Sequence, residues 1–366
     1  MVPSILKGYT MSKLLLVPVL FFAYAFFMLS NASAIDIDNK NLTTKTLLDQ
    51  YRGDPENLKN AYQLITEVLN ENPENAMAYV QLSRLIRKAG FMMRRNQKPV
   101  YRPGTLKQSR EALEQALLLD PKLFDAYFTG VFLCLDEENI VQAREYASKL
   151  KQLSPNSQKS ELALLNIAYH EKKFDKAIAI AESILATSKE PGVIDATYTN
   201  LIDVYTLQKK YKEADLAYRE QMALQPNDPW LLDAYASFQY YYLENYDKTI
   251  EYGMQALNIM DFGMARKHVG LAYSGKAFKA RAEKKYAEAI ELYTLGIQYY
   301  PSARMYANLG DSYMELGEER NDKDLIEQAR ATLKKALQID PEEGVARDYM
   351  ERIKRKYPQS TERTGS

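Results

Sequence analysis

The chain has 366 residues, a length that fits either two or three globular domains or one continuous array of repeats. Its 48 Lys and Arg residues balance its 48 Asp and Glu residues, which argues against a nucleic-acid-binding protein because such a protein needs a basic surface. The single cysteine excludes an intramolecular disulfide framework and a cysteine-rich zinc site, and the two histidines, His170 and His268, lack the spacing of metal ligands.

Residues 1–34 have the pattern of a secretory signal. Basic residues precede an apolar run from Leu14 to Leu29, and Ala32-Ser33-Ala34 then supplies the small residues of a signal-peptidase site. We therefore expect cleavage after Ala34. The alternative is an uncleaved membrane anchor, although the sixteen residues of the run span only ~24 Å as a helix and a bilayer core is ~30 Å thick. Residues 35–41 are polar and are expected to form a linker.

A repeated spacing of small residues and prolines runs through the rest of the chain. An aromatic residue lies three positions before a small residue in several repeats, as in Phe174 before Ala177. In five places an alanine lies twelve residues before a proline: Ala61 and Pro73, Ala143 and Pro155, Ala214 and Pro226, Ala289 and Pro301, and Ala329 and Pro341. One unit of about 34 residues is therefore copied along the chain.

The residue sizes predict the structure of this unit. A small residue in a second helix lets the first helix approach closely, and the proline ends the pair because it cannot continue a helix. Each unit is then a helix hairpin with one apolar face left exposed. Because a single hairpin cannot bury that face, neighbouring hairpins must stack on one another.

In its period, its two helices and its alanine-to-proline spacing, the unit resembles the tetratricopeptide repeat (TPR) family. Tyr306, Leu309-Gly310 and Tyr313 match the first-helix pattern of that family most closely. The resemblance implies an all-α, right-handed solenoid over residues 42–343, followed by a capping helix over 344–358 and a disordered tail over 359–366. The expected hairpins are 42–75, 76–123, 124–157, 158–194, 195–229, 230–263, 264–303 and 304–343.

The second hairpin is longer than the period requires, and the surplus is a basic insertion at 87–110. It contains no acidic residue and eight basic ones: Arg87, Lys88, Arg94, Arg95, Lys98, Arg102, Lys107 and Arg110. One interpretation is a solvated connector. The other is a contact for an anionic partner, because charge of one sign causes self-repulsion that a connector does not need. For that role we select Arg94, Arg95, Lys98 and Arg102.

The resemblance also implies that a partner lies in a concave groove built from the first helices. A carboxylate clamp of the kind found in some family members is not expected, since its cationic positions hold Leu162, Leu231 and Tyr235 here. Counted from the repeat starts, the expected groove residues are Phe128, Phe132, Asn166, Asn200, Asp203, Phe238, Tyr241, Asn308 and Asp311.

The sequence contains no recognisable catalytic motif. Cys134 lies in an apolar stretch and is expected to be buried, and neither histidine has an acid partner placed by a motif. We therefore expect a non-enzymatic scaffold without cofactor or metal, exported to a bacterial periplasm or secreted, that binds a partner protein in the groove. The alternative is that the 87–110 segment binds an anionic glycan or a lipid head group.

Overall fold

The computed structural model of the chain describes residues 34–51, 53–95 and 98–358. The predicted signal, apart from Ala34, and the predicted tail at 359–366 lie outside this range. In the described part, seventeen helices and one hairpin of two strands form two compact units, which divide at Gln208. This division falls inside the expected fifth hairpin.

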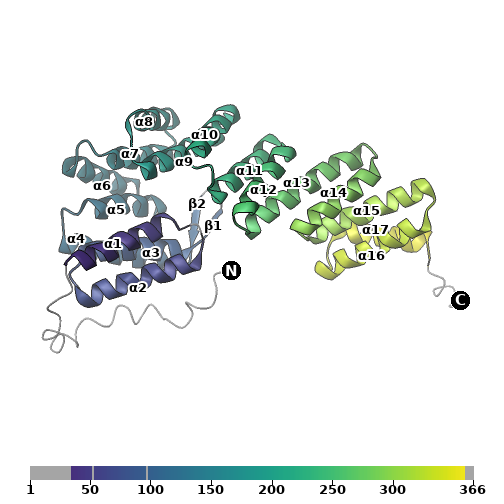
Figure 1. Cartoon of the computed structure of the whole chain (residues 1–366), viewed down its shortest axis with the longest axis horizontal. Coiled ribbons are helices and arrows are strands. Elements are labelled where there is room, and N and C mark those ends of the chain that lie inside the picture. Colours follow the sequence, from purple (N-terminus) through teal and green to yellow (C-terminus); the bar gives the residue numbers. More distant parts are fainter. Residues whose placement is uncertain (1–33, 52, 96–97, 359–366) are drawn as a thin grey trace. The chain divides into compact units, whose positions relative to one another are not determined.

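Unit 1 contains the first nine helices and both strands (Figure 1). Its helices are α1 Ala34–Asp49, α2 Pro55–Glu71, α3 Ala76–Gly90, α4 Thr105–Leu119, α5 Phe124–Asp136, α6 Ile140–Leu153, α7 Gln158–His170, α8 Phe174–Thr187 and α9 Pro191–Leu207, and its strands are β1 Phe91–Arg95 and β2 Lys98–Tyr101.

Unit 2 contains the remaining eight helices. They are α10 Tyr211–Leu224, α11 Pro229–Leu243, α12 Tyr246–Ile259, α13 Gly263–Ala282, α14 Tyr286–Tyr299, α15 Ala303–Arg320, α16 Lys323–Ile339 and α17 Gly344–Lys356.

Consecutive helices pack as hairpins, which confirms the all-α solenoid of stacked hairpins. In unit 1 the first helices of successive hairpins also contact one another, from α1 through α3, α5 and α7 to α9. The second helices α2, α4, α6 and α8 each pack against the first helix of their own hairpin and make up the other layer. The first helices of unit 1 therefore share one face, as a partner-binding surface requires.

The small residues of the repeat lie where the hairpin helices meet. Side chains of Ala61, Ala143, Ala214, Ala289 and Ala329 are all completely buried. A larger side chain at these positions would push the two helices apart, so residue size fixes the helix spacing. The close approach inferred from the sequence is thus confirmed.

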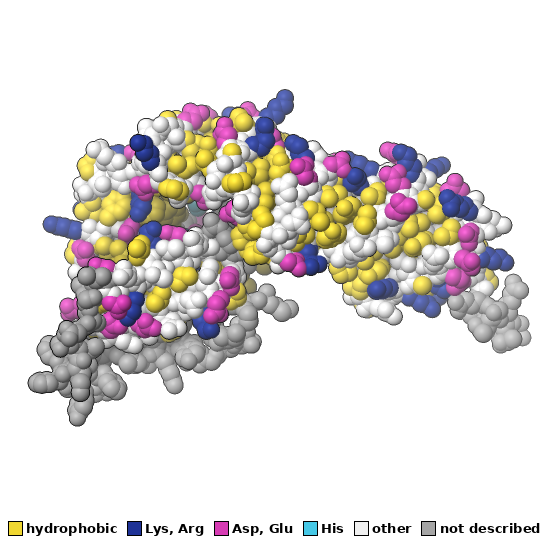
Figure 2. All heavy atoms as spheres, viewed as in Figure 1, with side chains coloured by type: hydrophobic (Ala, Val, Ile, Leu, Met, Phe, Trp, Pro, Cys, Tyr) yellow, Lys and Arg dark blue, Asp and Glu magenta, His cyan; other side chains and the backbone are white. Residues whose placement is uncertain are grey.

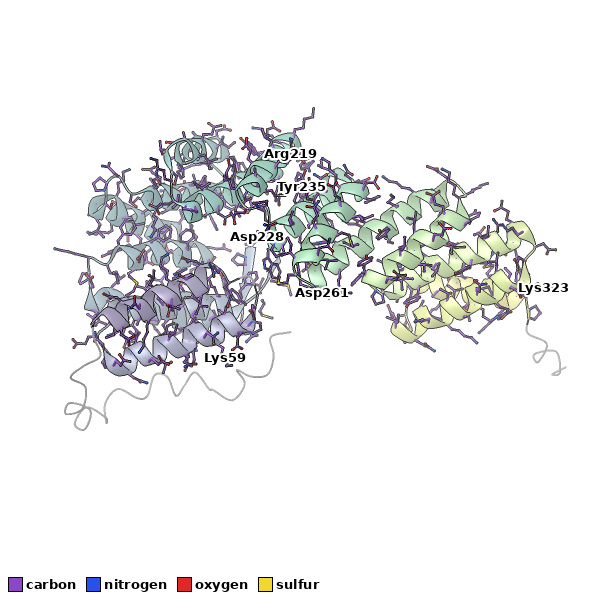
Figure 3. All side chains as sticks on the ribbon, in the orientation of Figure 1. Lys59, Arg219, Asp228, Tyr235, Asp261 and Lys323 are labelled. Carbon is purple, nitrogen blue, oxygen red and sulfur yellow. The ribbon has the colours of Figure 1, made fainter. Side chains whose placement is uncertain are left out.

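Local signals set the ends of the helices. Asp54 and Asp228 accept hydrogen bonds from the first turns of α2 and α11, and in both helices a proline follows as the first residue. Asp228 is labelled in Figure 3. In the described part of the chain, six turns place a residue in the left-handed region two positions before a second helix, with φ of 48 to 60°: Glu138, Lys172, Lys209, Glu244, Lys284 and Asn321.

The polar linker predicted at 35–41 is wrong, because α1 begins at Ala34. Lys40 explains the difference: its Nζ lies 3.1 Å from Asp36 in the preceding turn and 2.6 Å and 3.6 Å from Glu71 and Glu67 of α2. These contacts hold the first turns of α1 against α2. The polar residues at 35–41 therefore belong to the solvent side of a helix and do not form a linker.

The basic insertion is mostly regular structure. Its ends belong to α3 and α4, and its centre is the antiparallel pair β1 and β2. In the register, Arg95 lies opposite Lys98, Arg94 opposite Pro99 and Met93 opposite Val100, with an irregularity between Phe91 and Met93. In the described part of the chain, no helix has both the length and the apolar character needed to cross a membrane.

Candidate functional site

The first helices of unit 1 present an aromatic pair between two cations. Phe128 and Phe132 lie one turn apart on α5, and their rings meet edge to face with centroids 5.0 Å apart. Arg87 of α3 lies over the Phe132 ring at 5.9 Å, and Lys159 of α7 lies over the Phe128 ring at 5.8 Å. Three successive hairpins thus form one apolar patch framed by positive charge.

Both cations also contact carboxylates of α5. Lys159 Nζ lies 3.5 Å from Asp125, and Arg87 Nε lies 3.4 Å from Asp136. All four side chains keep contact with solvent, with 15 to 31% of their surface exposed. Because partly exposed ion pairs contribute little free energy, carboxylates of a partner can replace these contacts at small cost.

Two asparagines continue this surface. Asn166 of α7 and Asn200 of α9 are partly buried, and their side-chain amides donate to the carbonyls of Leu162 and Ala196, each at 2.8 Å. Each carboxamide keeps its oxygen and one N–H, for which the described part of the chain supplies no hydrogen-bond partner. A peptide backbone offers complementary groups. We name this surface, from Arg87 through Phe128, Phe132 and Lys159 to Asn166 and Asn200, the unit 1 face.

The other expected groove residues have mixed positions. Asp203 lies partly buried on α9, one turn beyond Asn200, and Asn308 is partly buried on α15. Tyr241 of α11 is 54% exposed. These three residues therefore keep some contact with solvent.

Phe238 and Asp311 are corrections, because both are core residues. Phe238 is 3% exposed and packs against Tyr218 and Tyr242, with ring centroids 5.2 Å and 5.5 Å away. Asp311 is completely buried and pairs with Arg281 at 2.5 Å. Their positions were transferred by counting along a repeat, and for these two residues that count leads to the packed side of the first helix.

Buried polar contacts tie the helices of unit 2 together. Asp215 of α10 accepts from the Tyr235 hydroxyl at 2.6 Å and from Gln239 at 2.8 Å, both on α11, and Arg219 lies 3.1 Å from its other oxygen. Arg219 and Tyr235 are labelled in Figure 3. Near the end of the unit, Asp311 of α15 lies between Arg281 of α13 and Tyr349 of α17. Burial raises the pKa of its carboxyl group, and the Tyr349 hydroxyl and Arg281 oppose this effect.

Sequence analysis missed an acid partner for His268. His268 Nδ1 on α13 lies 2.7 Å from Asp233 Oδ1 on α11, and each side chain is 7% exposed. The two residues are 35 positions apart, so they occupy equivalent sites in consecutive first helices. The repeat period itself was the signal that could have paired them. Since both are enclosed, the pair links two hairpins.

The basic insertion contacts an acidic segment of its own unit. Tyr101 donates to Asp136 at 2.6 Å, Lys98 Nζ lies 2.6 Å from Glu138, and Arg110 pairs with Glu137. The Asp136–Glu138 segment ends α5 and follows Phe132 by one turn. Part of the positive charge that suggested an anionic partner is therefore neutralised within the chain.

The four residues selected for that role differ in position. Lys98 is exposed but paired, whereas Arg102 is exposed and has no ion pair among the described residues. Arg94 and Arg95 lie in β1, and their side chains are outside the described part. Because Tyr101 and Lys98 hold the hairpin of β1 and β2 against the end of α5, the interpretation as a connector has a structural basis.

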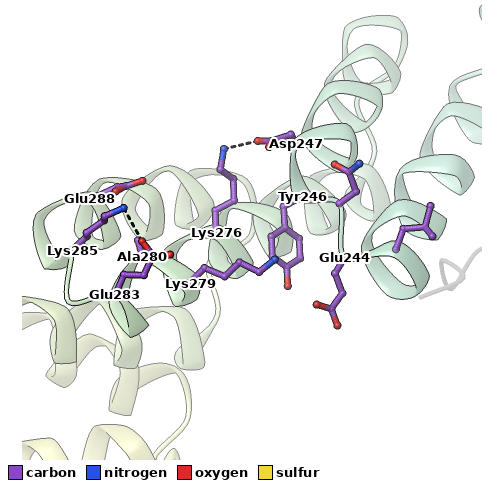
Figure 4. Close-up of a pocket in the computed structure, with 11 residues that line it drawn as sticks. Glu244, Tyr246, Asp247, Lys276, Lys279, Ala280, Glu283, Lys285 and Glu288 are labelled. Carbon is purple, nitrogen blue, oxygen red and sulfur yellow. Dashed lines mark hydrogen bonds and ion pairs between the residues drawn. The ribbon is translucent and has the colours of Figure 1, made fainter.

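The remaining candidates for chemistry are enclosed or neutralised. Cys134 is buried, as expected, and burial raises the pKa of its thiol. A cavity of about 470 Å³ in unit 2 opens between the start of α12 and α13 (Figure 4). Its lysines already have partners: Lys276 contacts Asp247 at 2.6 Å, Lys285 contacts Glu283 at 2.7 Å, and Lys279 lies 4.6 Å from the ring centre of Tyr246.

Hydrophobic side chains also reach the surface of unit 2. Figure 2 shows them in yellow over several of its helices. The most exposed are Phe278 at 60%, Leu224 at 58% and Tyr241 at 54%. They lie on three different helices, and Arg281 lies 6.0 Å from the centre of the Phe278 ring. The unit 1 face has two cations beside a pair of rings that contact each other, so it is the stronger candidate.

No family model and no curated protein matches the sequence. Among solved structures, the human IFIT1 dimer with m7Gppp-AAAA has a TM-score of 0.55 and 14% identity, over 88% of this chain and 72% of that chain. The APC/C hetero-tetramer Cut9-Hcn1 has a TM-score of 0.46 and 17% identity, over 88% of this chain and 57% of that chain. A Thermus thermophilus TPR protein has a TM-score of 0.44 and 18% identity, over 55% and 98%.

At these identities the likeness extends to the fold alone. The chain has an all-α fold of stacked helix hairpins, which is the fold that the resemblance to the TPR family implied. It spans 57% of the Cut9 chain. A fold by itself does not define a function, so the partner has to be argued from the unit 1 face.

Proposed function

We propose that this protein is a non-enzymatic scaffold that binds a segment of a partner protein on the unit 1 face. The observation that carries the proposal is the aromatic pair, Phe128 and Phe132, set between Arg87 and Lys159 on adjoining helices. Aromatic anchors beside charged groups are the features that dominate binding free energy at protein interfaces. Burial of Cys134 and His268 supports a role without catalysis.

The surface favours an extended segment with an apolar side chain next to acidic ones. The apolar side chain would cover the two phenylalanine rings. The carboxylates of the segment would replace the present carboxylate partners of Arg87 and Lys159. Asn166 and Asn200 would bond the backbone, which requires no particular sequence. The alternative partner, an anionic glycan or lipid head group at 87–110, has less support because Lys98 and Arg110 already pair with carboxylates.

Affinity capture from the cells that produce the protein tests the surface. The double variant Phe128→Ala and Phe132→Ala is expected to lower recovery of the captured partner roughly tenfold or more. Leu118→Ala is the matched control, because Leu118 is an apolar residue that is 74% exposed on α4, in the other layer. It should leave recovery unchanged.

Asn166→Ala guards against a loss of folding in the double variant, since it removes only partner-facing amide groups and one bond within α7. We expect a partial loss of recovery with an unchanged melting temperature. Recovery of the same partners in equal amounts by all these variants would show that the unit 1 face does not bind them.

We also propose that the protein is exported and that its signal is cleaved after Ala34. The support is the signal pattern of residues 1–34, which ends in the small residues Ala32-Ser33-Ala34. N-terminal sequencing of the cellular protein should return Ile35 as the first residue. A chain that keeps its first residues and sediments with membranes would instead identify an anchor.

A further inference from the structure

The hairpin of unit 1 has an unpaired strand edge. In the described part of the chain β1 pairs with β2 alone, so one side of β1 has no neighbouring strand. Phe91, Met92 and Met93 of β1 are 39%, 54% and 54% exposed. Free N–H and C=O groups along an edge of this kind are a template for another strand.

Pro99 indicates which backbone groups are free. It has no N–H, so it fits only at a ladder position where no hydrogen bond is donated. Arg94 lies opposite Pro99, and in an antiparallel pair both residues of such a position direct their N–H and C=O away from the partner strand. The backbone N–H and C=O of Arg94 therefore point to the open edge of β1.

The edge belongs to a hairpin that is held in place. Tyr101 and Lys98 of β2 contact Asp136 and Glu138 at the end of α5, each at 2.6 Å. The backbone also closes the base of the hairpin, where Arg102 N–H donates to the Gly90 carbonyl at 2.9 Å. A fixed edge loses less conformational freedom on binding than a free loop does.

We propose that the open edge of β1 binds an extended, acidic segment of a partner protein by adding it as a third strand. Charge favours this occupant, because the sequence places Arg94 and Arg95 in β1, and Arg102 at the base is exposed without an ion pair among the described residues. A second copy of the chain is disfavoured, since pairing two β1 strands would bring the arginines of both copies together.

This site is separate from the unit 1 face and does not rest on it. The two surfaces are neighbours, because Asp136 contacts both Arg87 of the unit 1 face and Tyr101 of β2. One extended segment could occupy both, but each makes its own contacts. Strand addition depends on backbone hydrogen bonds, which distinguishes it from charge attraction alone.

The test compares two substitutions of Arg94 in the full protein. Arg94→Ala removes the charge of the side chain and keeps the backbone N–H. Arg94→Pro removes the charge and the N–H, and it breaks no backbone hydrogen bond to β2. The probe is a fluorescein-labelled peptide of about eight residues that alternates Val and Glu, a length typical of a strand, followed by anisotropy. We expect Arg94→Ala to weaken binding up to about fivefold and Arg94→Pro to weaken it roughly tenfold further.

A second measurement leaves the protein unchanged. Two further forms of the peptide carry N-methyl groups, one on its odd-numbered and one on its even-numbered residues. Neither form can complete the hydrogen bonds of a strand ladder in both registers, and both should lose most of their binding. A Val and Lys peptide should not bind in the same range. Equal binding of the parent and the two variants, full binding of both N-methylated peptides, or no binding of the Val and Glu peptide to the parent would overturn the proposal. Self-association that Arg94→Pro abolishes would do so too, by making a second copy the occupant.

Discussion

Gly270→Ala is expected to lower the melting temperature, although alanine is the better helix former. A Cβ atom at Gly270 would lie 2.6 Å from Tyr300 Cβ and 2.9 Å from the Gly296 carbonyl oxygen. Because one of these atoms is backbone, α13 and α14 must separate, at a cost of ~1–3 kcal/mol. Alanine regains only about 1 kcal/mol of helix propensity. The net loss should appear as a fall of a few degrees in a thermal melt.

Gly344→Ala is the matched control, because Gly344 begins α17 in the same unit and a Cβ there would meet nothing within 4 Å. The same chemical change should therefore be neutral or stabilise by up to ~1 kcal/mol. Identical melting temperatures for both variants would show that α13 and α14 do not touch at Gly270. Comparing the two variants separates the effect of contact between helices from the effect of helix propensity.

Asp311→Asn is expected to stabilise unit 2 compared with the parent protein, and this difference in stability is expected to grow as the pH rises. Burial raises the pKa of the Asp311 carboxyl in the folded protein above its ordinary value of 3.8. The folded state then binds the proton more tightly than the unfolded state does, so the contribution of this group to stability is complete at low pH and is lost as the pH rises through the folded pKa. Asparagine cannot ionise and removes this loss.

Urea unfolding of the parent and the variant at a series of pH values measures the effect. The free energy of unfolding of Asp311→Asn minus that of the parent should grow as the pH rises above 3.8 and then level off. Tyr349→Phe should enlarge the parent's loss, because the Tyr349 hydroxyl favours the ionised form of Asp311. A difference that stays constant with pH, or shrinks as pH rises, would contradict the raised pKa.

The sequence by itself determined the repeating hairpin. The spacing of Ala143 before Pro155 and of Ala289 before Pro301 predicts where two helices meet and where the pair ends, and both alanines are completely buried. It also identified Phe128 and Phe132 as residues of a shared face. These features follow from residue size and helical periodicity. Both act within one hairpin, so residues close together in the sequence are enough to predict them.

Tertiary structure alone decided the contacts between hairpins. His268 meets Asp233 one repeat away, and the cations of the basic insertion meet Asp136–Glu138 of the next hairpin. Within the first hairpin, tertiary structure pairs Lys40 of α1 with Glu71 of α2. Which side of a first helix faces its neighbour depends on the rotation between stacked hairpins, and that rotation is set by the packing of many side chains together. For this reason Phe238 and Asp311, assigned to a groove by counting along the repeat, lie in the core of unit 2.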